Sequence, residues 1–216
     1  MSLFITGTDT GAGKTWVTAA LVKTMRAEGR DAVAAKPVCC GGRGDAEILA
    51  EASGGLPVGE INPLYFDMPL APAVAAAMQG LPVDPSGLVA ACRGLLEKHE
   101  TVVFEGIGGW EVPIGPGFRV SDLAAALGLP VVVVVANRLG ALNHAALTVN
   151  AVRATRTPGG SSLSCPGIVV NEMNDEPGLP EISNLAALEE LTGVPVLAHV
   201  IHGQEEIRLD GIAGEL

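Results

Sequence analysis

The chain has 216 residues, of which 48% are apolar and only 3% aromatic, and its formal net charge is −11. A chain of this length can bury a substantial core, and we predict one domain spanning residues 1–216. The negative charge argues against nucleic acid and anionic membranes as partners, because both repel an acidic surface.

The four cysteines, Cys39, Cys40, Cys92 and Cys165, have no Cys-x-x-Cys spacing, which predicts reduced thiols. The first apolar run begins almost at Met1 and leaves no room for a signal peptide. The apolar run 129–136 is too short to span a bilayer. We therefore expect a cytoplasmic protein.

Residues 7–15 read Gly-Thr-Asp-Thr-Gly-Ala-Gly-Lys-Thr, between a predicted strand (2–6) and an amphipathic helical pattern. This is the strand–loop–helix order of a P-loop, in which backbone N–H groups bind phosphate oxygens. Lys14 would neutralise the outer phosphates, and the Thr15 hydroxyl would ligate Mg²⁺. The generic pattern has its first glycine where this chain has Thr8, and here Gly7 stands one residue earlier.

Two ionisable residues follow the second predicted strand, 32–36. Lys36 ends this strand within reach of a P-loop on a neighbouring strand, although a solvated cation at the sheet edge is the alternative. Asp45 lies in a glycine-rich turn and is either a helix cap or a functional carboxylate. The chain has only four lysines, so two of them near the phosphate loop require an explanation.

A helical pattern over 86–98, with Ser86 as a candidate cap, precedes the third predicted strand, 101–105. Glu105 ends that strand and is followed by Gly106-Ile107-Gly108-Gly109-Trp110. An acid that ends a buried strand in a P-loop fold holds or orients Mg²⁺. We favour this role over that of a surface acid.

Polar residues also follow the fourth and fifth predicted strands, 131–136 and 167–171. Residues 137–144 open a helix predicted over 142–155, whose free N–H groups can bind a carboxylate, although Asn143 can simply be its cap. Asn171 follows the fifth strand, where P-loop proteins often contact the base. An Asn-Lys-x-Asp guanine box is absent, which favours adenine.

A last helical pattern (183–193) and a last strand (196–201) complete a regular alternation of strand and helix. The strand runs are short, apolar and rich in β-branched residues, as is typical of buried parallel strands. We predict an α/β fold of the P-loop NTPase type, with three layers (α/β/α) and a mostly parallel central sheet. Ligands of such sheets bind beyond the carboxyl ends of the strands.

With these residues in place, the chain resembles the dethiobiotin synthetase family over essentially its whole length. The motifs that carry the resemblance are Gly-Thr-Asp-Thr-Gly-Ala-Gly-Lys-Thr (7–15), Lys-Pro-Val (36–38), Asn62-Pro63 with Tyr65 and Phe66, Glu-Gly-Ile-Gly-Gly-Trp (105–110), Arg-Leu-Gly-Ala-Leu-Asn-His-Ala (138–145) and Val-Val-Asn (169–171). The early Gly7 is the family form of the phosphate loop.

The resemblance implies an ATP- and Mg²⁺-dependent cyclo-ligase that joins CO₂ to 7,8-diaminopelargonate in biotin synthesis. One amine takes up CO₂ as a carbamate, the γ-phosphate is transferred to it to give a carbamic–phosphoric anhydride, and the second amine displaces phosphate. A carbamate and a triphosphate are both anions, so their approach requires fixed cations in a site that excludes water. Lys14, Lys36 and Mg²⁺ would supply these cations.

The resemblance also implies roles for individual residues. The implied catalytic residues are Lys36, Lys14 and Thr10, and the implied Mg²⁺ ligands are Thr15, Asp45 and Glu105. The implied substrate contacts are Thr10, Lys36, Cys40, Leu139, Gly140 and Asn143. The implied nucleotide contacts are Gly11, Ala12, Gly13, Lys14, Thr15, Trp16, Asp45, Glu105, Gly106, Ile107, Gly108, Asn171, Glu172, Val200, Ile201 and His202. The family is homodimeric, and the helix start at 139–143 of one subunit would receive the carboxylate of substrate bound mainly by the other.

The sequence departs from the family pattern at three places. Cys40 stands where the family commonly has a serine near the diamine, and a thiol is the weaker hydrogen-bond donor. Ile201 stands where a proline often precedes the adenine contact, and the loop 157–166 is longer than expected.

Two other classes of protein share the phosphate loop. The synthetase part of a cobyrinic acid amidotransferase would normally carry a glutaminase domain, for which we expect no room in this chain. An ATPase switch that binds a protein partner uses a second lysine inside the loop and often a Cys-x-x-Cys, and this sequence has neither.

Overall fold

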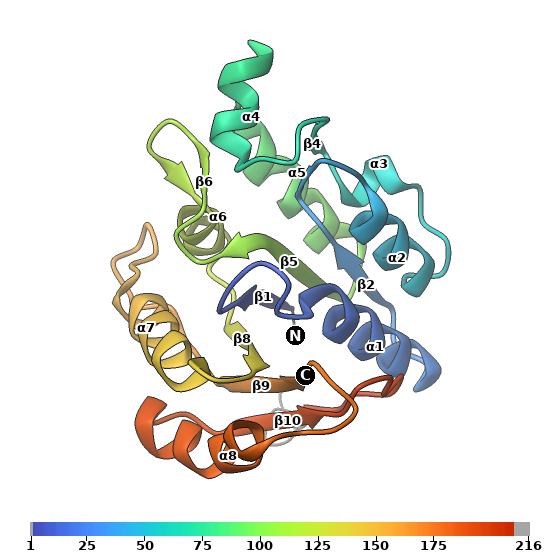
Figure 1. Ribbon diagram of the computed structural model, residues 1–216. Helices are drawn as coiled ribbons and strands as arrows, with labels where there is room; N and C mark the ends of the chain where they lie inside the picture. The colour runs from blue at the N-terminus through green and yellow to red at the C-terminus, as the bar shows by residue number, and fades with distance from the viewer. Residues whose placement is uncertain (1, 210–216) are drawn as a thin grey trace.

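Figure 1 shows the protein as a computed structural model that describes residues 2–209. Met1 and residues 210–216, which the predicted domain includes, lie outside the described residues. Within residues 2–209, no helix combines the length and the apolar character that a membrane crossing requires.

A six-stranded sheet forms the centre of the fold (Figure 1). Its strands are β1 (Leu3–Gly7), β2 (Ala32–Ala35), β5 (Thr101–Gly109), β8 (Val131–Asn137), β9 (Gly167–Glu172) and β10 (Val196–Val200). They lie in the order β10-β9-β8-β1-β5-β2, and every neighbouring pair is parallel. The six predicted strands are confirmed, and β1, which leads into the phosphate loop, lies between β5 and β8.

Helices cover both faces of this sheet, as the sequence predicts. They are α1 (Lys14–Ala27), α2 (Gly44–Ala52), α3 (Val58–Ile61), α4 (Pro72–Gln79), α5 (Pro85–Lys98), α6 (Val120–Leu127), α7 (Ala141–Ala154) and α8 (Leu179–Thr192). In Figure 1, α1 and α2 lie on one side of the sheet, and α5, α6 and α7 lie on the other. The three-layer α/β/α architecture is therefore confirmed.

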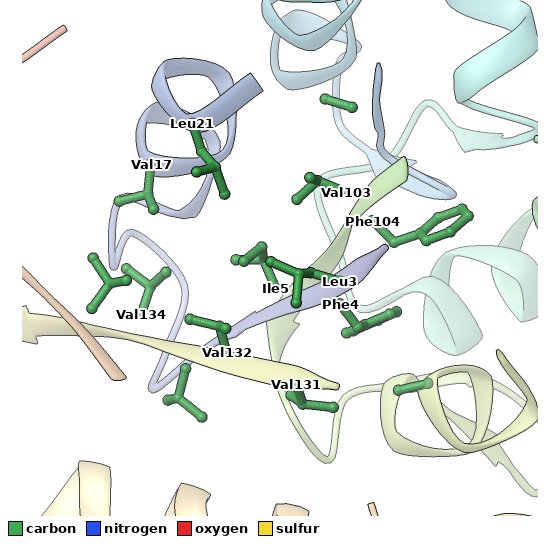
Figure 2. Close-up of a cluster of buried hydrophobic side chains, with 14 of the residues drawn as sticks. Leu3, Phe4, Ile5, Val17, Leu21, Val103, Phe104, Val131, Val132 and Val134 are labelled. Carbon is green, nitrogen blue, oxygen red and sulfur yellow. The ribbon is translucent and has the colours of Figure 1, made fainter. Parts of the chain in front are cut away.

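The core fills the space between the sheet and the helices with aliphatic side chains. Figure 2 shows Val17 and Leu21 of α1 beside the central strands, where Ile5 and Val132 are fully buried. Strand residues alternate between the two faces, and Phe4 lies edge-on to Trp110 with 6.3 Å between ring centroids. Each fully buried aliphatic side chain contributes about 1.5–3 kcal/mol, which holds the strand ends in fixed register around the site.

Four short strands lie outside the main sheet and were not predicted. β3 (Val38–Cys40) pairs in parallel with β4 (Leu64–Phe66), and β6 (Pro113–Gly115) pairs in antiparallel orientation with β7 (Phe118–Arg119). The β3–β4 pair continues the chain beyond the carboxyl end of β2. It carries residues 38–42 and the following loop, 67–71, to the same edge of the molecule.

The structure corrects several expected helix ends. Asp84 occupies the N-cap of α5 with Pro85 in its first turn, so Ser86 is not the cap. Asn143 is not the cap of α7, because the helix begins at Ala141 behind Gly140, whose φ is +95°. Asp45 lies in the first turn of α2, one residue inside the helix, and is not its cap. α8 begins at Leu179, four residues before the predicted start at 183.

Candidate functional site

The phosphate loop joins β1 to α1 and is shaped by glycines with positive φ. Gly11 has φ +73°, and Gly13, at the N-cap of α1, has φ +87°. The first turn of α1 contains no acidic residue, so its free N–H groups and its dipole favour an anion. A Cβ at Gly13 would lie 2.1 Å from Nδ2 of Asn171, so both the backbone and a close neighbour require glycine there.

Lys14 is the first residue of α1, and its side chain is buried against the loop. Its Nζ donates a hydrogen bond to the carbonyl oxygen of Asp9 at 3.0 Å. Burial lowers the pKa of Lys14 to about 8, with a further contribution from the positive charge of Lys36 and a partial opposing effect of Glu105. Because this ammonium group has so few protein partners, an anionic ligand would strongly stabilise its charged form.

Lys36, Asp45, Glu105 and Thr15 form a polar cluster beside this loop, in which Lys36 and Glu105 are buried and the Asp45 side chain is 52% exposed. The Nζ of Lys36 donates to Oδ2 of Asp45 at 2.9 Å and also contacts Oε1 of Glu105. The Thr15 hydroxyl donates to the same Oε1 at 2.9 Å. These side chains come from α1, the end of β2, the first turn of α2, and β5, so the order of the sheet brings them together.

Burial and ion pairing act in opposite directions on the pKa values of Lys36 and Asp45 in this cluster. Burial alone would lower the pKa of Lys36, but the adjacent Glu105 and Asp45 raise it above its ordinary value. Burial alone would raise the pKa of Asp45, but Lys36 and Thr15 lower it below its ordinary value. Lys36 therefore carries a stable positive charge although it is only 3% exposed.

The cluster fits a hard divalent cation. Oε2 of Glu105 is buried and has no hydrogen-bond partner among the described residues, which is unusual for a carboxylate oxygen. A hydroxyl and two carboxylates are oxygen ligands of the kind that Mg²⁺ prefers. The Thr15 hydroxyl, which contacts the same carboxylate as Lys36, is the third oxygen of this set.

A cavity of about 700 Å³ opens over the loop and the cluster. Its apolar lining includes the segment 69–72 and Val112. The lining residues are Thr10, Gly11, Gly13, Lys14, Thr15, Lys36, Cys39, Cys40, Gly42, Asp45, Pro69, Leu70, Ala71, Pro72, Glu105, Ile107, Gly108 and Val112. Burial raises the pKa of Cys40 and raises that of Cys39 to about 11, so both thiols are protonated at neutral pH.

Sequence reasoning identified the polar residues of this cavity together with Ile107 and Gly108, and missed the rest of its lining. Cys39, Gly42, Val112 and the segment 69–72 were not among the candidate residues. The pairing of β3 with β4 brings in Cys39, Gly42 and the segment 69–72, and a Cβ at Gly41 would lie 2.6 Å from Cβ of Pro69, whereas Val112 follows β5 and lies next to Gly108. A glycine pair after one short apolar run and a Pro-x-x-Pro after another were the available signals.

The candidate nucleotide contacts outside the cavity have other partners. Nδ2 of Asn171 donates to the carbonyl of Ala12 at 3.2 Å and so touches the phosphate loop itself. Oε1 of Glu172 lies 2.6 Å from both Nδ2 of Asn137 and Nε2 of His199, so this acid is part of a network between strand ends. Val200 is buried, Ile201 is exposed, and Nδ1 of His202 lies 2.8 Å from Oδ1 of Asp175.

The remaining candidate residues are not part of the cavity lining. Trp16 is 45% exposed and donates through Nε1 to the carbonyl of Gln204 at 2.8 Å. Leu139, Gly140 and Asn143 form the start of α7 and do not line the cavity, and Leu139 is 83% exposed. Arg138 connects this segment to the phosphate loop through a loose ion pair with Asp9, 3.6 Å between Nη2 and Oδ2.

Fold and site together define a nucleotide-binding protein of the P-loop class. Solved structures agree on the fold: a ParA family ATPase from Chlorobium tepidum TLS covers 94% of this chain and 85% of its own, with a TM-score of 0.58 at 13% identity. The signal recognition particle receptor FtsY from Elizabethkingia anophelis covers 96% of this chain and 61% of its own, with a TM-score of 0.57 at 14% identity. A family model described as an AAA domain matches residues 1–204.

Sequence relatives specify the family. The ATP-dependent dethiobiotin synthetase BioD of Akkermansia muciniphila is 43% identical over 210 residues, covering 97% of this chain and 96% of the relative. The protein of the same name from Anaeromyxobacter dehalogenans (strain 2CP-C) is 46% identical over 204 residues, covering 89% of each. The chain belongs to the ATP-dependent dethiobiotin synthetase family, as its motifs indicate.

Proposed function

We propose that this protein is an ATP- and Mg²⁺-dependent cyclo-ligase that converts 7,8-diaminopelargonate and CO₂ to dethiobiotin in biotin synthesis. The observation that carries the proposal is the convergence of Lys14, Lys36, Asp45 and Glu105 on one cavity, in a chain of the dethiobiotin synthetase family. Two buried ammonium groups beside a phosphate loop suit a reaction in which two anions must meet.

In the proposed complex, the triphosphate lies along the loop from Gly11 to Thr15. The N–H groups at the start of α1 bind its oxygens, and Lys14 exchanges the carbonyl of Asp9 for the outer phosphates. Mg²⁺ held by Thr15, Asp45 and Glu105 would neutralise charge that develops on the transferred phosphoryl group. Asn171, which already contacts the loop at Ala12, lies on the side where the base is expected.

The diamine would lie in the same cavity beside Thr10, Lys36 and Cys40, with its aliphatic chain along the apolar segment 69–72. One amine nitrogen bonds to the carbon of CO₂ and loses a proton, which gives a carbamate. A carbamate oxygen then bonds to the γ-phosphorus as ADP leaves. The second amine attacks the carbonyl carbon, phosphate leaves, and the cyclic urea closes. Lys36 would hold the carbamate oxygens through the first two steps.

The proposal includes a homodimer, because the far end of the substrate needs a separate receptor. Among the described residues, the cationic side chains that line the cavity are Lys14 and Lys36, and both are assigned to the reacting end. The start of α7 offers free N–H groups next to the exposed Leu139, and Leu147 on the same helix is 62% exposed. These features suit a segment that receives the carboxylate of substrate held by a second subunit.

Phosphate release from ATP, measured with bicarbonate and 7,8-diaminopelargonate and with each omitted in turn, tests this function. We expect release to depend on every component and dethiobiotin to accumulate in equal amount, as measured by mass spectrometry. Release that does not require the diamine would refute the ligase and would favour an ATPase switch.

A further inference from the structure

In this structure, Lys36 occupies the space between the two carboxylates that are proposed to bind metal. Its Nζ lies 2.9 Å from Oδ2 of Asp45 and contacts Oε1 of Glu105. Lys36 and Glu105 are 3% and 1% exposed, so neither group is solvated. A buried carboxylate needs a positive partner, and Lys36 is the cation that supplies it here.

The hydrogen bonds of Glu105 are unevenly divided between its two oxygens. Oε1 accepts from both Lys36 and Thr15, whereas Oε2 is buried without a partner in the described part of the chain. A divalent cation that reached Oε2, the Thr15 hydroxyl and Asp45 would come close to the ammonium of Lys36. Two cations cannot share these oxygens at close range, because their repulsion is strong beside Glu105, which is buried away from water.

We propose that Lys36 and a divalent cation exclude one another from Asp45 and Glu105. In the nucleotide-free protein, Lys36 neutralises the carboxylates and suppresses metal binding. When the metal–nucleotide complex binds, the ammonium leaves them and turns its flexible side chain into the cavity. This inference rests on the proposed function, since it concerns the metal and nucleotide site assigned there.

The exchange gives the site an order of events. The positive charge of Lys36 becomes available to an anionic reactant only after the metal has replaced it at the carboxylates. Lys14 differs in this respect, because its hydrogen-bond partner among the described residues is the carbonyl of Asp9, although both carboxylates lie near enough to affect it electrostatically. Lys14 is therefore the matched control, since it carries the same charge in the same cavity without contacting either acid.

The test measures Mn²⁺ binding to the nucleotide-free protein. The electron paramagnetic resonance signal of free Mn²⁺ reports how much of the ion remains unbound. We expect Lys36→Met to bind Mn²⁺ at least about tenfold more tightly than wild type, because the competing ammonium is gone. Lys14→Met removes a positive charge that contacts neither acid, and should change the affinity by no more than about threefold. Lys36→Gln should behave as Lys36→Met does.

A second measurement covers the case in which removal of Lys36 weakens the fold. Mn²⁺ should raise the thermal unfolding temperature of both Lys36 variants more than that of wild type, since the metal replaces the lost positive charge. A Lys36 variant that is unfolded alone should fold when Mn²⁺ is added, as followed by circular dichroism. A Lys36 variant that Mn²⁺ does not stabilise more than wild type would overturn the competition.

The outcomes separate this inference from the proposed function. Equal Mn²⁺ affinity in wild type and both Lys36 variants, with weaker binding in Glu105→Gln, would overturn the exchange and leave the metal site in place. Absence of Mn²⁺ binding in every variant, with and without ATP, would overturn both the exchange and the metal site. Dethiobiotin formation in the assay that omits each component in turn tests the proposed function, and it is measured independently of both Mn²⁺ results.

Discussion

At the scale of single residues, Gly13 is required both by its left-handed backbone and by a close neighbour, whereas Gly29 is required by its backbone alone. Gly13 and Gly29 have the same φ of +87°, but a Cβ at Gly13 would meet Asn171 at 2.1 Å, whereas a Cβ at Gly29 would have no neighbour within 4 Å. Both alanine variants should lose about 1–2 kcal/mol of unfolding free energy from the left-handed backbone. Gly13→Ala alone should displace Asn171 and the loop, and should weaken ATP binding at least about tenfold.

Urea unfolding and calorimetric ATP titration measure these two effects. Gly29→Ala serves as the control for backbone strain, and its ATP affinity should equal that of wild type. Retention of wild-type ATP affinity by Gly13→Ala would show that the contact between Asn171 and the loop does not shape the phosphate site.

Lys14 makes ATP binding depend on pH in a defined direction. Burial and Lys36 lower its pKa to about 8 in the free protein, and bound phosphates would raise the pKa by stabilising the charged form. ATP binding should therefore take up a proton when the pH lies above about 8, and affinity should fall as pH rises through that value. Calorimetry in buffers of different ionisation enthalpy measures the proton uptake. Lys14→Met should bind ATP weakly at every pH and take up no such proton, and equal uptake in this variant would contradict the assignment.

At the scale of elements, the main sheet was predictable because each strand carries its own signal. β8 is five valines followed by alanine and asparagine, and all seven residues are buried. Such a run fits only a strand covered on both faces. The residues after the apolar runs were equally informative: Lys36 directly follows β2, and Glu105 follows the apolar run of β5, which continues to Gly109 and lies next to β2 in the sheet.

The β3–β4 pair and the helix ends could not be predicted from the sequence, for physical reasons. Strands of three residues are too short to show a period, and β3 and β4 are held together by pairing across more than twenty residues. Gly140 at φ +95° lets α7 start without a side-chain cap, which rules out the alternative interpretation of Asn143 as the cap. The segment 69–72 reaches the cavity through the β3–β4 pair, which is why this part of the lining was not predicted.

The polar network at the ends of β8, β9 and β10 was also not predicted. Asn184 of α8 donates to Oδ1 of Asn137 at 2.8 Å, and Nδ2 of Asn137 donates to Glu172 at 2.6 Å. Glu172 was a candidate nucleotide contact because it follows Asn171 at the end of a strand. Adjacent strand residues point to opposite faces, so Asn171 reaches the loop while Glu172 turns to Asn137 and His199.

At the scale of the whole molecule, the last described residues complete the packing around α1. Ile207 and Leu209 are 1% and 2% exposed, and the backbone N–H of Ile207 donates to the hydroxyl of Thr24 in α1 at 3.2 Å. The same segment reaches the site, because Trp16, next to Thr15, donates to the carbonyl of Gln204. The sequence showed a final strand at 196–201 and no periodic signal after it, so this contact with the first helix could come only from the tertiary structure.

The packing of this last segment against α1 makes Ile207 part of the core. Removal of the Ile207 side chain should therefore destabilise the whole fold. Ile207→Ala deletes a buried side chain, so we expect a loss of about 2–4 kcal/mol of unfolding free energy in urea. Ile201→Ala removes the same atoms from a side chain that is 59% exposed, and should cost no more than about 0.5 kcal/mol. ATP affinity of folded Ile207→Ala should also fall, because the segment that holds Trp16 is loosened beside Thr15. If both variants unfold at the same urea concentration as wild type, the segment lies on the surface of an already complete fold, and its contact with α1 contributes nothing to stability.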